Sequence, residues 1–100
     1  MELVNLTAVI DGKRYSTEKA TVLAHDCYWD GHNFERHGGN TWLLRTPNGR
    51  YFLQHQTLWQ GERDYIEPVS KEEAIKWYED LPEKEVEFEE AFPGVAVEEA

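Results

Sequence analysis

The sequence predicts a single α+β domain: a twisted antiparallel sheet of about four or five strands with one C-terminal helix, residues 70–81, packed on one face. Two turn signals indicate the sheet, Asp11-Gly12 and the Pro-Asn-Gly run at 47–49, because each separates segments rich in β-branched and aromatic residues. A capped amphipathic segment indicates the helix. With 100 residues, the chain is of the size expected for one hydrophobic core.

The first 29 residues are expected to form a hairpin and then a further strand. Asp11-Gly12 tolerates the positive φ angles that both central residues of a two-residue type I′ turn require, so Val9 should pair with Arg14. Residues 20–29 are expected to be the next strand. Strict alternation would place four of its side chains on one face: Leu23, His25, Cys27 and Trp29.

Residues 40–59 contain the clearest hairpin of the chain. Pro47 presets φ at the first central position of the turn, and Gly49 can take the left-handed conformation that a type I turn with a bulge requires. If Thr46 faces Arg50, the numbers of paired residues must sum to 96. Both faces of this hairpin are partly apolar, so we expect it near the middle of its sheet.

The predicted helix begins at a capping box, since Ser70 and Glu73 stand at the required spacing. A short strand at 65–69 is expected to precede it, and the helix has an apolar stripe made of Ala74, Ile75, Tyr78 and Leu81. Pro82 ends it, so the domain is expected to span 1–82.

Residues 83–100 are expected to form an acidic C-terminal tail. They hold seven acids and one base. The alternation at Val86 and Phe88 leaves a strand as the alternative.

The net charge of −10 is unevenly distributed along the chain. Residues 1–61 hold six acids and six bases, whereas residues 62–100 hold 14 acids and four bases. The acidic part should therefore bind no nucleic acid directly, and a partner bound there should be basic. The neutral part carries Arg14, Arg36, Arg45 and Arg50 without opposing net charge. No apolar run is long enough to span a bilayer, and a single cysteine favours the cytoplasm, so no membrane partner is expected.

Candidate catalytic and metal-binding residues form no established motif. Cys27, His25 and His55 could hold zinc if their segments converged, but their spacing matches no zinc module, and the alternative is a buried cysteine with surface histidines. A nucleophilic Cys-His pair would be formed by Cys27 with His25 or His55. Neither a phosphate-binding loop nor a dinucleotide fingerprint is present, so no cofactor is expected. A non-enzymatic role is favoured over an enzymatic one, and a small hydrolase or a metal protein is the remaining alternative.

The aromatic residues suggest a binding surface instead. Trp59, Tyr51 and Trp29, together with Arg45, are the candidate binding residues, because Trp, Tyr and Arg are enriched at the energetic centres of protein interfaces. The alternative is that these aromatic residues fill the core. The sequence thus favours a small cytoplasmic, non-enzymatic protein-binding domain of undefined oligomeric state. A second hypothesis is an acidic mimic of nucleic acid that inhibits a DNA- or RNA-binding enzyme.

Three stretches resemble a loose set of small uncharacterised bacterial proteins: IDGKRYSTEKA at 10–20, LLRTPNGRYFL at 43–53 and IEPVSKEEAIKWYEDLPE at 66–83. The shared features are a DGK(R)Y-xTExA start, an RT-xxG-xYFL hairpin and a P-hS-xEEA-xxW helix, over about 40 of the 100 residues. They are turn and cap elements, so the resemblance implies a common fold and carries over no functional residue. Some small acidic proteins of mobile elements inhibit host defence nucleases, which is the setting that the mimicry hypothesis implies.

Overall fold

The computed structural model describes residues 3, 5–26, 39–57 and 64–96. Seven strands and two helices follow one another along the described chain: β1 (Thr7–Ile10), β2 (Lys13–Ser16), β3 (Thr21–His25), β4 (Gly39–Arg45), β5 (Tyr51–Thr57), β6 (Tyr65–Val69), α1 (Lys71–Asp80), β7 (Glu83–Lys84) and α2 (Phe88–Ala91). None of the described helices is long and apolar enough to cross a membrane.

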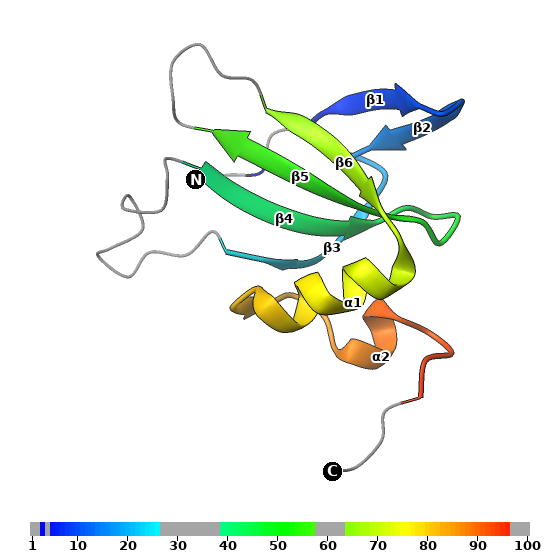
Figure 1. The fold of residues 1–100 in the computed structure, drawn as a ribbon, viewed down its shortest axis with the longest axis vertical. Helices are drawn as coiled ribbons and strands as arrows, with labels where there is room; N and C mark the ends of the chain where they lie inside the picture. Colours follow the sequence, from blue (N-terminus) through cyan, green and yellow to red (C-terminus); the bar gives the residue numbers. More distant parts are fainter. Residues whose placement is uncertain (1–2, 4, 27–38, 58–63, 97–100) are drawn as a thin grey trace.

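The strands form a five-stranded antiparallel sheet in the order β6-β5-β4-β3-β7, and β1 and β2 form a separate two-stranded sheet. Both helices lie on one side of the large sheet, which we call the helix face, and the β1–β2 hairpin covers the other side, the hairpin face (Figure 1). This arrangement confirms the predicted α+β fold with a twisted antiparallel sheet and a helix packed on it.

The two turns have the predicted geometry. Asp11 and Gly12 have φ angles of 52° and 73°, and Val9 pairs with Arg14. At the second turn Gly49 has a φ of 83° and donates a hydrogen bond to the carbonyl of Thr46. Because the turn residues fix the pairing on both sides, each hairpin has the predicted register.

The β4–β5 hairpin lies at the centre of the sheet, as its two apolar faces predict. Leu43 pairs with Leu53 and Leu44 with Phe52, so paired numbers sum to 96. Leu43 and Leu53 belong to the core under the helices, whereas Leu44 and Phe52 belong to the core under the β1–β2 hairpin. All four side chains are fully buried.

β3 departs from the predicted alternation. Val22 pairs with Leu44 and Ala24 with Leu43, so Leu23 is an extra residue that bulges between them. Leu23 and Ala24 therefore both enter the helix-face core. The prediction that Leu23 and His25 share a face was wrong, because the bulge moves His25 opposite Trp42 on the hairpin face. The expected continuation of the strand to residue 29 lies outside the described residues.

Helix α1 forms where its capping signal predicts. The Ser70 hydroxyl accepts a hydrogen bond from the Glu73 amide, and the Glu73 carboxylate accepts one from the Ser70 amide, each over 3.1 Å. Ala74 and Tyr78 are buried against the sheet, and Leu81 follows as the C-terminal cap.

Residues 83–96 do not form the separate tail expected beyond residue 82. Glu83 and Lys84 add β7 to the edge of β3, and α2 follows directly. Ala91 and Phe92 have no exposed surface and belong to the helix-face core. The apolar side chains of this acidic segment thus complete the core, while its carboxylates face the solvent. The last residues, 97–100, lie outside the described part.

Candidate functional site

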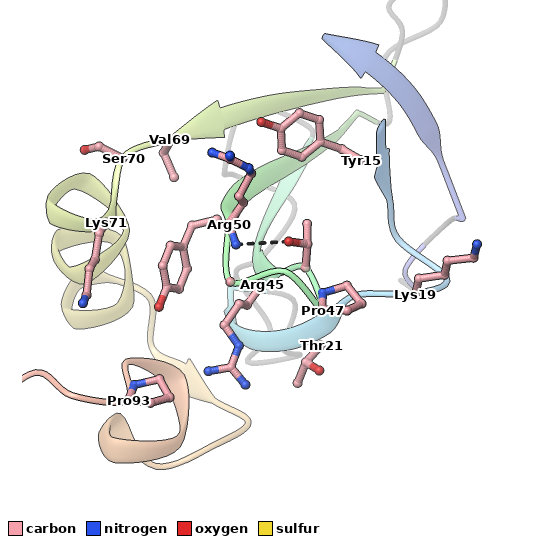
Figure 2. A pocket seen from close by; sticks show the side chains of 13 residues that line it. Tyr15, Lys19, Thr21, Arg45, Pro47, Arg50, Val69, Ser70, Lys71 and Pro93 are labelled. Carbon is pink, nitrogen blue, oxygen red and sulfur yellow. Dashed lines mark hydrogen bonds between the residues drawn. The ribbon is translucent and has the colours of Figure 1, made fainter. Parts of the chain in front are cut away.

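Basic side chains gather around the turn between β4 and β5. A pocket of about 640 Å³ lies between this turn, the start of α1 and Pro93. Figure 2 shows Arg45 and Arg50 extending from the turn in opposite directions, Arg45 toward Pro93 and Arg50 toward Val69. Lys19 and Lys71 stand on opposite sides of the pocket (Figure 2).

A second pocket, of about 470 Å³, lies between the same turn and the β1–β2 hairpin. Its own cations are Lys13 and Arg14. The two pockets share five lining residues, which are Tyr15, Lys19, Thr46, Pro47 and Arg50. We therefore treat them as the first and second lobes of one basic cleft.

The charge of this cleft is opposite to that of the chain as a whole. Six of the ten lysines and arginines line it, namely Lys13, Arg14, Lys19, Arg45, Arg50 and Lys71. No carboxylate lines either lobe among the described residues, and within that part of the chain none of the six cations forms an ion pair. Each cation thus keeps donors for a ligand.

The acids of the described chain are concentrated in the helical layer. Nine exposed carboxylates lie between residues 72 and 90, on the two helices and on the segment between them, which includes the edge strand β7: Glu72, Glu73, Glu79, Asp80, Glu83, Glu85, Glu87, Glu89 and Glu90. Most of the described acids therefore lie on the segment after β6, whereas the described lining of the cleft holds cations and no carboxylate.

Local hydrogen bonds hold the turn that carries Arg45 and Arg50. The Thr46 amide donates to the Arg50 carbonyl over 2.8 Å, and the Arg50 amide donates to the Thr46 hydroxyl over 3.1 Å. Gly49 closes the turn in a left-handed conformation. The backbone on which both arginines stand is consequently fixed.

Two of the predicted binding residues lie in the first lobe and also hold the fold together. The Tyr51 hydroxyl donates a hydrogen bond to the Ala91 carbonyl over 3.0 Å, and an Arg45 Nη1 donor reaches the same carbonyl over 3.1 Å. Tyr51 is only 7 % exposed and stacks on Phe92 with ring centroids 5.1 Å apart. Tyr51 therefore belongs mainly to the core, whereas Arg45 keeps further N–H donors for the cleft.

Of the other predicted site residues, the structure describes only His25 and His55, and it does not bring these two together. Trp29, Trp59 and Cys27 lie outside the described residues. His25 lies on the hairpin face and 2.7 Å from a carboxylate oxygen of Glu85, while His55 lies on the opposite face.

The metal hypothesis gains no geometric support from this placement. His55 lies 2.9 Å from a carboxylate oxygen of Glu67 and stacks on Tyr65. In the part of the chain that the structure describes, no three His, Cys, Asp or Glu side chains are placed to hold a metal ion. The two described candidate ligands, His25 and His55, cannot share an ion across the sheet.

Sequence reasoning did not select most cations of the cleft as site residues. Two signals point to Arg14, Arg45 and Arg50. The charge balance shows that they belong to a segment without net negative charge, and the hairpin registers place them beside the two turns. No turn or register signal relates Lys19 or Lys71 to these arginines, because only the tertiary fold brings them to the same turn.

Comparison with protein-family models, with curated proteins and with solved structures found no match to this chain.

Proposed function

We propose that this protein is a non-enzymatic binding domain that takes an anionic part of a protein partner into its basic cleft. The observation that carries the proposal is the convergence of six cations on one turn of a chain with a net charge of −10. Like charges repel one another, so an uncompensated cluster costs folding free energy unless a ligand offsets it. An anionic ligand would supply that compensation.

The residues that line the cleft favour binding over catalysis. Among the described residues, its walls hold no His, Cys, Asp or Glu side chain that could act as a general base or an activated nucleophile. Instead they offer guanidinium and ammonium groups, which are suited to hold carboxylates or phosphates in place. We further propose a cytoplasmic location, because the single cysteine requires no oxidising compartment.

A charge-reversal experiment tests the proposal. Affinity capture from the lysate of the native host is compared for the wild type, Arg50→Glu and Lys76→Glu. Arg50 lies at the junction of the two lobes, whereas Lys76 is exposed on α1 beside Trp77 and Asp80 and lines neither lobe. Both substitutions change the net charge equally, so they differ only in location.

Loss of the captured partner with Arg50→Glu but not with Lys76→Glu is the expected result. Capture should also weaken at high salt, because exposed charges are screened over about 8 Å at physiological ionic strength. Equal capture by the two variants would refute the proposal.

The acidic helical layer supports a second candidate function, the mimicry of nucleic acid. Imitation of a phosphate backbone requires carboxylates on ordered structure, and Glu87, Glu89 and Glu90 lie on or beside α2, which is packed into the core. A double substitution, Glu87→Lys with Glu90→Lys, should then abolish capture of a basic partner while Arg50→Glu preserves it. The opposite ranking supports the basic cleft.

A further inference from the structure

The two lobes of the basic cleft are each equipped with their own cations. The first lobe holds Arg45 and Lys71, and the second holds Lys13 and Arg14. Arg50 and Lys19 line both lobes and therefore stand between these pairs. Positive charge thus extends along the cleft from the start of α1 to the β1–β2 hairpin.

The size of the cleft exceeds the need of a single small anion. Volumes of about 640 and 470 Å³ each fall within the range of roughly 300–1,000 Å³ that is typical of a complete ligand site. A ligand with one carboxylate would pair with the cations of one lobe and leave the cations of the other lobe without a partner. A ligand that crosses the junction would compensate the positive charge of both lobes.

We propose that the cleft binds an extended acidic peptide segment that places at least one carboxylate in each lobe. This inference rests on the proposed function and specifies its ligand. In an extended chain, side chains on the same side recur about every 6.6–7 Å, so two acids at positions i and i+2, or i and i+4, can face the same wall. Arg50 and Lys19 then contact the chain between them.

Two observations favour a peptide over a nucleic acid. Tyr15 and Tyr51, the aromatic side chains that line the cleft in the described chain, are only 6 % and 7 % exposed, so neither offers an open ring for base stacking. The net charge of −10 would also repel a long polyphosphate backbone outside the cleft. A short acidic segment adds fewer negative charges near the helical layer.

The test uses labelled peptides of glycine, serine and glutamate, and fluorescence anisotropy with the full-length protein. One peptide series carries two glutamates at positions i and i+2 or i and i+4, a second carries one glutamate, and a third has glutamine at both positions. Labelled single-stranded oligo-dT of similar length is the nucleic-acid probe. Lys71→Ala removes a cation from the first lobe, Lys13→Ala with Arg14→Ala removes those of the second, and Lys76→Ala is the control.

At one spacing, the two-glutamate peptide should bind about fivefold more tightly than the one-glutamate peptide, because a second exposed ion pair adds to the binding free energy. Either lobe variant should remove most of this advantage, and Lys76→Ala should retain it. Equal affinity of the two peptides at every spacing, no effect of the lobe variants, or tighter binding of oligo-dT would each overturn the two-lobe inference. The proposed function fails separately, if Arg50→Glu and Lys76→Glu capture the partner equally.

Discussion

The Tyr51 hydroxyl on β5 donates a hydrogen bond over 3.0 Å to the main-chain carbonyl of Ala91, the last residue of α2. A helix leaves its last carbonyls without partners inside the helix, and here a tyrosine of β5 supplies one. Arg45 donates to the same carbonyl. The wall of the first lobe and the position of α2 are therefore coupled.

Replacement of Tyr51 by phenylalanine should lower the free energy of unfolding by about 1 kcal/mol, the usual contribution of one hydrogen bond. The ring remains stacked on Phe92, so packing should persist. Urea unfolding measures the change, and Tyr65→Phe is the matched control because that side chain is 55 % exposed. An equal effect of the two substitutions would show that the contact to Ala91 does not stabilise the fold.

Phe92→Ala should destabilise the protein far more, by about 3–5 kcal/mol, because it leaves a cavity in a tightly packed core. Phe92 has no exposed surface and contacts the rings of Tyr51, Tyr78 and Phe88. Thermal or urea unfolding provides the measurement, with Val9→Ala, at a side chain that is 65 % exposed, as the control. A loss below 1 kcal/mol would indicate that the segment after residue 82 is an unattached tail, as the sequence suggests.

Those parts of the fold that depend on neighbouring residues could be predicted from the sequence. Asp11-Gly12 and Gly49 determine both hairpin registers through their own backbone conformations, and Ser70 and Glu73 determine where α1 begins. These signals act over a few residues, so no knowledge of the remaining chain is needed.

Features that depend on distant packing could not be predicted in this way. The bulge at Leu23 has no sequence signature, because the extra residue is accommodated by the core that covers β3. The four residues of α2 are too few to form a stable helix alone and depend on the burial of Ala91 and Phe92. The candidate site also depends on distant packing, since Lys19 and Lys71 line the same pocket as Arg50 only in the folded chain.

Gly49→Ala should cost about 1–2 kcal/mol, the penalty of a left-handed conformation for a residue with a side chain. Gly49 has a φ of 83°, and a Cβ placed there meets no atom within 4 Å, so the cost is one of backbone conformation rather than of crowding. Gly49→Asn should cost less, because asparagine adopts this conformation more readily. Urea unfolding of the three proteins gives the ranking, and equal stability of the Ala and Asn variants would contradict this explanation.

The stability of the wild type should decrease at alkaline pH through Tyr78. Burial raises the pKa of the Tyr78 phenol above its ordinary value of 10.0, and the nearby charges of Glu87 and Glu89 raise it further. In the unfolded chain this phenol loses its proton near pH 10, whereas in the folded protein it does so only at higher pH. Its contribution is therefore complete below pH 10 and declines as the pH rises toward the folded-state pKa.

Tyr78→Phe separates this effect from the hydrogen bond that the Tyr78 hydroxyl donates to the Val86 carbonyl over 2.7 Å. At neutral pH the variant should be less stable by about 1 kcal/mol. Because phenylalanine does not ionise, the difference from the wild type should shrink as the pH rises above about 10. Urea unfolding at a series of pH values measures this difference, with Tyr65→Phe as the control. A difference that stays constant or grows would contradict the raised pKa.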